Sequence, residues 1–197
     1  MERIIETKIN EGDTKSFLDC QYFENIELLE KCILETQDKL IVNPKIRIFG
    51  KEATQHRSVG FFSNESIGYK FSGQTSQSIP LTPALAEILE YINHIFNSKF
   101  NGILVNRYDT GEEYIGAHSD DESKLGNSGV VALSWGATRK FRIRNKSDKK
   151  IVKDIDMNSG LLLQMGGDFQ KEFTHEVPIQ KKVKNVRVSL TFRKHTE

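Results

Sequence analysis

The chain has 197 residues, a formal net charge of +1, and hydrophobic and charged fractions of 37% and 28%. These values are typical of one soluble, globular domain with a sizeable core. The longest apolar runs, such as Leu161–Leu163, are too short to span a bilayer, and the N-terminus lacks the apolar segment of a signal peptide. The sequence therefore predicts an intracellular, soluble protein with no membrane partner.

The charge is unevenly distributed along the chain. Residues 1–40 contain ten acidic and five basic side chains, whereas eight basic residues and one acid fall between Arg139 and Lys153. Six more basic residues and no acid lie between Lys181 and Lys194. Solvated strand faces and loops usually explain such runs, but two basic stretches also suit a phosphate-bearing partner.

Residues 1–44 are expected to form an acidic, helical N-terminal extension. From about residue 23 to residue 37, apolar side chains recur at helical spacing: Phe23, Ile26, Leu29 and Ile33. Cys20 and Cys32 also fall in this segment, and neither belongs to a CxxC pair. We expect both to be reduced, structural thiols.

A second helix is predicted to begin at residue 82. Thr82 can cap its N-terminus, and Pro83 suits its first turn. Six apolar positions then form one stripe: Leu85, Ile88, Leu89, Ile92, Ile95 and Phe96. This stripe predicts packing against a sheet, and His94 beside it is expected to be structural.

From residue 102 onward the pattern changes to short strand-like runs separated by Gly, Asn, Asp and Ser. The runs are Gly102–Tyr108, Val130–Trp135, Lys140–Arg144, Gly160–Met165 and Val186–Arg193. Many short strands after helices predict an α+β, mainly β fold, in which N-terminal helices support a double-sheet barrel or jelly roll. Such barrels commonly hold a binding site in their mouth.

Three residues suit a divalent transition metal: His118, Asp120 and His175. Alternate residues of a strand share a face, so His118 and Asp120 can point at one ion while Ser119 points away. Two imidazoles and one carboxylate can occupy one face of a ferrous ion and leave the opposite face open. The same set also suits zinc, and a surface histidine beside solvated acids is the simpler alternative.

The last strand-like run has two different faces. Arg187, Ser189, Thr191 and Arg193 alternate with apolar residues. An interior guanidinium needs a carboxylate partner, which a dicarboxylic acid supplies; an edge strand with its basic residues in water is the alternative. On an earlier strand, Asn106 and Tyr108 place hydrogen-bonding groups on one face, where they either reach the same small molecule or flank a turn.

Several motifs closely resemble the AlkB family of DNA and RNA dealkylases. They are NRYDTGEEYIGAHSDDE (Asn106–Glu122), the segment from His175 through Pro178 to the following lysines, and the tail RVSLTFRK (Arg187–Lys194). Upstream, RIFGK (Arg47–Lys51) and YKFSG (Tyr69–Gly73) look like the subgroup typified by human AlkB homologues two and three. The resemblance covers roughly residues 45 to 194. The family tail usually begins Arg-x-Asn, and here Ser189 stands in the third place.

The resemblance implies a dioxygenase domain over residues 45–197, with a double-stranded β-helix (cupin-like) core and a nucleotide-recognition lid at about 45–75. Fe(II) would be bound by His118, Asp120 and His175. 2-Oxoglutarate would be bound by six residues: Asn106, Tyr108, Arg187, Ser189, Thr191 and Arg193. Arg187 would hold its distal carboxylate, and Arg193 the end near the iron. Oxygen is the other co-reactant, and ascorbate serves as reductant in assays.

The implied reaction is oxidative dealkylation of bases of the N1-methyladenine and N3-methylcytosine type in DNA, with release of formaldehyde, succinate and carbon dioxide. The expected partner is double-stranded DNA with a flipped base. Phe49 would enter the duplex, and the base pocket would contain Tyr69, Phe71, Ser72, Asp121 and Glu122. The alternating basic residues Lys140, Arg142 and Arg144 would contact phosphates.

Three alternatives remain at this stage. The same chemistry could act on RNA or another methylated substrate. The chain could instead be a non-catalytic nucleic-acid-binding barrel, or a zinc hydrolase. We expect a monomer, located in the nucleus if the source is eukaryotic and otherwise in the cytoplasm.

Overall fold

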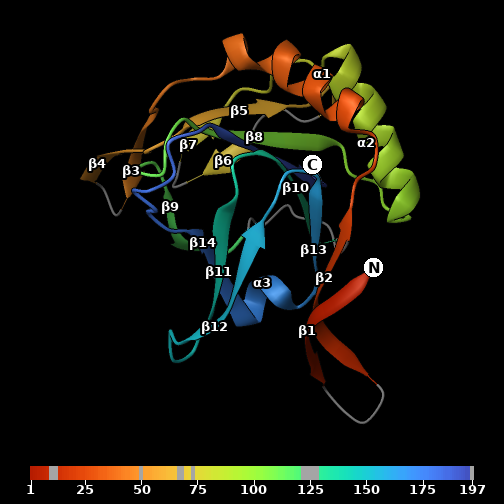
Figure 1. Ribbon diagram of the computed structural model, residues 1–197, viewed down its shortest axis with the longest axis vertical. Coiled ribbons are helices and arrows are strands. Elements are labelled where there is room, and N and C mark those ends of the chain that lie inside the picture. The colour runs from red at the N-terminus through yellow and green to blue at the C-terminus, as the bar shows by residue number, and fades with distance from the viewer. Residues whose placement is uncertain (9–12, 49–50, 66–68, 72–73, 121–128, 196–197) are drawn as a thin grey trace.

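The computed structural model describes residues 1–8, 13–48, 51–65, 69–71, 74–120 and 129–195. In the short strands beside the gaps, the side chains of residues 47–48, 69–71 and 74–76 are outside the described part. Two antiparallel sheets face each other, and two helices cover the outer side of the larger sheet (Figure 1). This arrangement confirms the expected mainly β, double-sheet architecture supported by helices.

Seven strands form the large sheet, in the spatial order β1 (Glu2–Lys8), β2 (Thr14–Tyr22), β13 (Leu161–Gly167), β10 (Val130–Gly136), β15 (Arg187–Arg193), β8 (Gly102–Tyr108) and β5 (Ser58–Phe62). Four strands form the small sheet, in the order β12 (Ile151–Met157), β11 (Arg139–Asn145), β14 (Phe173–Val177) and β9 (Ile115–His118). All five strand-like runs expected after residue 102 are strands. β12 and β14 were not among the runs named from the sequence, because their apolar and polar residues alternate less regularly. His118 lies on a strand as expected, at the end of β9, whereas Asp120 follows that strand.

The helices are α1 (Ile26–Thr36), the short η1 (Gln37–Lys39), α2 (Pro83–Ile95) and α3 (Phe169–Glu172). The α2 prediction is confirmed, because the Thr82 side chain accepts a hydrogen bond from the Leu85 amide and Pro83 opens the first turn. Asn25 caps α1 in the same way, through the Leu28 amide. Among the described residues, no helix is long and apolar enough to cross a membrane.

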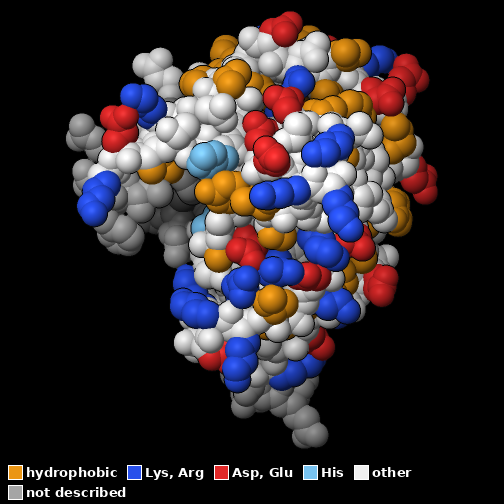
Figure 2. All heavy atoms as spheres, turned by 60° about the vertical axis from the view of Figure 1, so that its left-hand side comes forward, with side chains coloured by type: hydrophobic (Ala, Val, Ile, Leu, Met, Phe, Trp, Pro, Cys, Tyr) orange, Lys and Arg blue, Asp and Glu red, His pale blue; other side chains and the backbone are white. Residues whose placement is uncertain are grey.

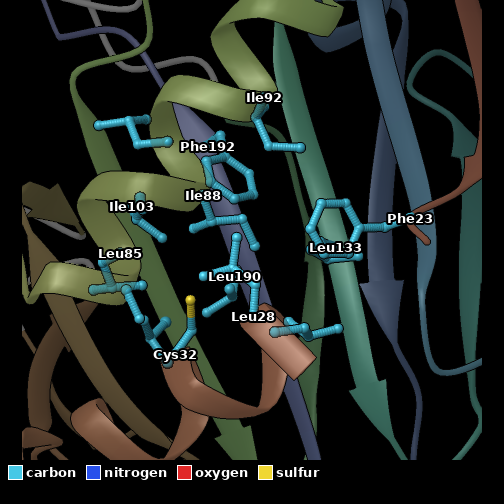
Figure 3. Packing of buried hydrophobic residues seen from close by; sticks show 14 of the residues in the cluster. Phe23, Leu28, Cys32, Leu85, Ile88, Ile92, Ile103, Leu133, Leu190 and Phe192 are labelled. Carbon is cyan, nitrogen blue, oxygen red and sulfur yellow. The ribbon is translucent and has the colours of Figure 1, made fainter. Parts of the chain in front are cut away.

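The principal core lies between α1, α2 and the outer face of the large sheet (Figure 3). The apolar stripe of α2 packs there as predicted, with Ile88 and Ile92 fully buried against Leu190 and Phe192 of β15. Each such side chain contributes about 1.5–3 kcal/mol by leaving water. A second core lies between the two sheets, around Leu163 and neighbouring apolar residues.

The N-terminal segment is not the expected helical extension. β1 pairs with β2, and β2 pairs with β13, so residues 2–22 extend the large sheet. The charges of this segment are partly cross-strand partners, since Arg3 lies opposite Asp19 and forms an ion pair with it. Within residues 1–44, the helical spacing from about residue 23 to residue 37 is confirmed by α1.

The expected lid at 45–75 is also not one unit. Two hairpins, β3 (Lys45–Ile48) with β4 (Lys51–Thr54) and β6 (Tyr69–Phe71) with β7 (Gln74–Ser76), flank strand β5. β5 belongs to the large sheet, because all five of its residues are buried and it pairs with β8. The two hairpins form separate two-stranded sheets, and Ile46, Ala53 and Thr54 of the β3–β4 hairpin border a cavity next to His118.

Candidate metal and cosubstrate site

The three predicted metal ligands converge at one end of the space between the sheets. His118 and His175 are cross-strand partners in the pair β9–β14, and their ring centroids are 4.4 Å apart. The Asp120 carboxylate lies 3.5 Å from His175 Nε2 and 3.9 Å from His118 Nε2. One ligand atom from each residue falls within 4.8 Å of the others.

Neighbouring groups fix these ligands in place. The backbone carbonyl of Gly116 lies 2.8 Å from His118 Nδ1, an arrangement that puts the proton on Nδ1 and leaves the Nε2 lone pair for a metal. Ser119 points away, as predicted, and donates to the Phe173 carbonyl, while the Asp120 amide donates to the Gln170 side chain. The Phe141 ring of β11 stacks on His175 at 5.0 Å.

The electrostatics of the three ligands suit metal binding. Burial lowers the pKa of His118, and burial together with the neighbouring His118 lowers the pKa of His175 to about 3. Burial alone would raise the pKa of Asp120, but Arg193 and the two histidines lower it to about 2. Neutral imidazoles and an ionised carboxylate are the protonation states that a divalent metal requires.

From this end a cavity extends along β15. The polar face of the strand lines it, with Arg187, Ser189, Thr191 and Arg193, and the neighbouring strand β8 adds Asn106 and Tyr108. All six residues predicted to bind the cosubstrate therefore border one cavity, together with the three metal ligands. The apolar face of β15 packs under the helices, so the strand is central and is not an edge strand in water.

The two arginines lie at opposite ends of β15. Arg193 is 1% exposed, and its Nη2 lies 3.4 Å from Asp120 Oδ1 at the metal end. Arg187 is 2% exposed and donates from Nε to Ser134 Oγ over 3.0 Å. Burial lowers the pKa of Arg187 to about 10. Among the described residues no carboxylate lies within 4.0 Å of Arg187, so this buried cation suits an anionic ligand.

Sequence reasoning missed Arg57, which precedes β5. It is 3% exposed, donates from Nε to Asn106 Oδ1 over 2.7 Å, and borders both this cavity and a larger outer one. It lies between the two upstream motifs that carry the family resemblance, Arg47–Lys51 and Tyr69–Gly73. The signal available in the sequence was an arginine directly before the short apolar run that became β5.

Several predicted substrate residues lie outside the described part of the structure. These are Phe49, Ser72, Asp121 and Glu122. Tyr69 and Phe71 belong to β6, whose backbone is described while its side chains are not. Their roles at the base pocket stay predictions.

The basic strand β11 has the expected one-sided pattern, but its charges have acid partners. Lys140 pairs with Asp156, Arg142 with Asp154, and Arg144 with Glu176, at N–O distances of 3.2, 2.8 and 2.8 Å. These acids come from β12 and β14 on either side. A phosphate contact from this strand would have to compete with those carboxylates.

The residues present fit Fe(II) and 2-oxoglutarate. Two imidazole Nε2 atoms and a carboxylate meet around one point, which is the donor set of a facial site with open positions. The buried Arg187 guanidinium at the far end offers a planar, two-pronged donor for a carboxylate. His118, Asp120 and His175 would hold the metal, and Arg187 would hold the distal end of the dicarboxylic acid.

Comparison with known proteins agrees with this assignment. The model of the 2OG-Fe(II) oxygenase superfamily matches residues 24–193. The human DNA oxidative demethylase ALKBH2 is 31% identical over 191 residues, which cover 90% of this chain and 73% of that protein. Human alkB homolog 3, an alpha-ketoglutarate-dependent dioxygenase, is 34% identical over 137 residues, or 64% of this chain and 48% of its own length.

Among solved structures, one described as OsALKBH1 superposes with a TM-score of 0.58 at 17% identity, over 92% of this chain and 97% of that chain. At this identity the superposition establishes the shared fold, a double-stranded β-helix core. Together with the metal triad, the family match shows an enzyme that depends on Fe(II) and 2-oxoglutarate. The chain therefore belongs to the 2OG-Fe(II) oxygenase superfamily, and within it to the AlkB family.

Proposed function

We propose that the enzyme removes alkyl groups from damaged bases in DNA, in particular from N1-methyladenine and N3-methylcytosine. The observation that carries the proposal is the position of one metal ligand, His118, at the boundary between two cavities. His118 borders both the inner cavity, which suits 2-oxoglutarate, and an outer one. The names of the ALKBH2 relatives, DNA oxidative demethylases, support DNA as the substrate.

The outer cavity has a volume of about 470 Å³, within the usual range for small-molecule sites. It is bordered by the β3–β4 hairpin and by β9, and by the stacked rings of His56 and Tyr114, whose centroids are 4.9 Å apart. A methyl group on a pairing nitrogen is inaccessible inside a duplex, so the base must leave the stack. A cavity of this size next to a metal ligand suits an extruded base.

His118, Asp120 and His175 would hold the iron, which with 2-oxoglutarate and oxygen would supply hydroxylation of the alkyl carbon; the group would then leave as an aldehyde and the base would be restored. The described residues hold and orient the reactants. His118, Asp120 and His175 fix the metal beside the outer cavity, while Arg187 anchors the cosubstrate at the far end. The proposal also assigns the base pocket to five residues and insertion into the duplex to Phe49. The five pocket residues are Tyr69, Phe71, Ser72, Asp121 and Glu122.

We also propose that the enzyme acts as a monomer on double-stranded DNA. Its location would follow its substrate, in the nucleus of a eukaryote or the cytoplasm of a prokaryote. An isolated strand and an RNA oligomer are the alternative substrates, and both are compared in the test.

The test is mass spectrometry of methylated oligonucleotides after incubation with the protein, Fe(II), 2-oxoglutarate and ascorbate. Loss of the mass of one CH₂ group from a duplex containing N1-methyladenine, with equal formation of succinate, is the expected result. Faster loss from RNA than from the duplex would assign the enzyme to RNA. Succinate formation without any change in the oligonucleotides would overturn nucleic-acid dealkylation.

A further inference from the structure

Arg139, the first residue of β11, holds together the loops that flank the two metal-bearing strands. It is 1% exposed. Its Nη1 donates to the Thr110 carbonyl over 3.0 Å, and its Nη2 donates to the carbonyls of Glu113 and Pro178 over 2.7 and 2.9 Å. Its Nε donates to Gln180 Oε1 over 3.3 Å. One guanidinium thus binds the loop that leads into β9 and the loop that leaves β14.

These two loops also contact each other directly. Gly111 donates its amide to the Val183 carbonyl and accepts from the Gln180 amide, over 2.8 and 2.7 Å. A Cβ atom at Gly111 would lie 1.9 Å from the Gln180 carbonyl oxygen, so only glycine permits this approach. The carbonyls that surround Arg139 therefore belong to a closely packed frame.

Within this frame, Arg139 packs on Tyr108, a residue that lines the cosubstrate cavity. Its Cζ is 5.5 Å from the centre of the Tyr108 ring, and the Cζ of Arg187 is 5.4 Å from the same ring. Both distances are typical of cation–π contacts. Tyr108 lines the cavity opposite Arg187 in the β8–β15 register. No carboxylate among the described residues lies within 4.0 Å of Arg139, so a second buried positive charge lies behind Tyr108, beyond the residues that line the far end of the cavity.

We propose that Arg139 is a positioning residue for 2-oxoglutarate: it fixes the Tyr108 ring beside Arg187 and adds a second buried positive charge at the end of the cavity that receives the distal carboxylate. This inference rests on the proposed role of Arg187. Arg139 touches neither the cosubstrate nor the metal, and it acts through Tyr108 and through its field. In a partly buried site, such a charge changes the affinity for an anion severalfold.

The preference for a dicarboxylic acid is the readout that separates this role from a general structural one. Calorimetry gives the affinities of 2-oxoglutarate and of 2-oxopentanoate, which has a methyl group in place of the distal carboxylate. The protein is loaded with Mn(II) so that the acids bind without turnover. Arg139→Gln is expected to weaken 2-oxoglutarate binding about tenfold and to leave 2-oxopentanoate binding within about twofold of the wild type. Equal weakening of both acids, or an unchanged preference, overturns the proposal.

A matched control and a second variant keep the test decisive. Arg107→Gln removes a partly exposed arginine next to Tyr108 that pairs with Asp109 at 2.7 Å, and it should not change the preference. If Arg139→Gln does not fold, Arg139→Met takes its place, because methionine removes the charge and keeps an unbranched side chain that can fill the space. A reduced preference for the dicarboxylic acid in that variant supports the proposal, and an unchanged one overturns it.

Arg187→Gln separates the proposed role of Arg187 from that of Arg139. It should abolish most of the preference for 2-oxoglutarate over 2-oxopentanoate. If it does not, the proposed role of Arg187 is wrong, and the Arg139 inference falls with it. If Arg187→Gln abolishes the preference while Arg139→Gln leaves it intact, only the inference about Arg139 is wrong.

Discussion

Strands β15 and β11 both carry basic residues at alternate positions, yet they place them in opposite surroundings. In β15 all seven residues are buried, and Arg187 and Arg193 face the cavity between the sheets. In β11 the alternating Lys140, Arg142 and Arg144 face outward, where each meets an acid from a neighbouring strand. Figure 2 shows this mixing on the side of the molecule that carries the small sheet, with basic side chains interspersed among acidic ones.

The difference comes from neighbouring strands. β11 lies between β12 and β14, which place Asp154 and Glu176 directly opposite Arg142 in the register. β15 lies between β10 and β8, which offer Arg187 only neutral groups, such as Ser134 and Tyr108. The outer arginines are therefore neutralised within the protein, whereas Arg187 has no carboxylate partner among the described residues and suits an anionic ligand.

The largest expected effect comes from removing the carboxylate that faces Arg193 at the metal end of β15. Asp120→Ala removes one metal ligand and the carboxylate that faces Arg193. Since the loss of a hydrogen-bond partner of a ligand already costs about 10–100-fold in metal affinity, loss of the ligand itself should exceed about 100-fold, with no detectable dealkylation. Metal content after dialysis and oligonucleotide mass spectrometry measure both. Asp154→Ala, which removes a carboxylate of the outer face, is the control, and equal metal loss in it would contradict the assignment.

Replacing Arg187 by an apolar residue should weaken 2-oxoglutarate binding but stabilise the folded protein when no cosubstrate is present. Arg187→Met should raise the 2-oxoglutarate requirement at least about 30-fold, because a carboxylate loses a buried, charge-assisted partner. Without cosubstrate, the free energy of unfolding should rise by about 1–2 kcal/mol, since a buried guanidinium without a carboxylate partner is replaced by an apolar side chain. Urea unfolding with and without 2-oxoglutarate measures both. A loss of several kcal/mol without cosubstrate would mean that Arg187 mainly supports the fold.

The sequence predicted strand β15 well. Alternation of polar and apolar residues in Arg187–Arg193 was enough to place four side chains on one face, and the distant ligands His118, Asp120 and His175 meet as expected. Helix α2 was also predictable, because its cap and its apolar stripe are local features.

What the sequence could not predict depends on contacts between distant strands. Nothing near Arg142 indicates that Asp154 lies opposite it, and nothing near Arg57 indicates its hydrogen bond with Asn106. Likewise, the residues of β1 and β2 look like an acidic, solvated segment until Arg3 is placed opposite Asp19. Cross-strand pairing sets the role of each of these charges, and it is a property of the sheet rather than of the local sequence.

A third prediction tests which basic residues meet the phosphates of a duplex. Lys181, Lys182 and Lys184 are exposed in the loop before β15, and none has a carboxylate within 4.0 Å among the described residues. Changing all three to Gln should reduce the slope of the salt dependence of duplex binding by up to about 0.9 for each phosphate that the protein no longer neutralises. Changing Lys140, Arg142 and Arg144 to Gln removes the same charge from β11, and should reduce the slope less because acids already hold those groups.

The two triple variants therefore control each other for net charge. Fluorescence anisotropy of a labelled duplex at several salt concentrations gives both slopes. A larger change in the β11 variant would favour the expectation drawn from the sequence, in which that strand contacts the backbone. In that case the phosphates would have to displace Asp154, Asp156 and Glu176.

The smallest effect should come from the ion pair between Arg142 and Asp154 on the outer face of β11. Arg142 donates to both Asp154 oxygens over 2.8 Å, but the two side chains keep 24% and 27% of their exposure. A double-mutant cycle with Arg142→Ala and Asp154→Ala should give a coupling of about 0.3–1 kcal/mol at neutral pH, as for other partly exposed pairs.

The hydrogen bond from Arg142 lowers the pKa of Asp154 from its ordinary value of 3.8. The stabilisation is therefore present above that value and is lost as the pH falls through the lowered pKa, when the carboxylate becomes protonated in the folded protein. A coupling of several kcal/mol that persists in acid would mean that the outer pair is as shielded from water as Arg187, and the contrast between the two strands would disappear.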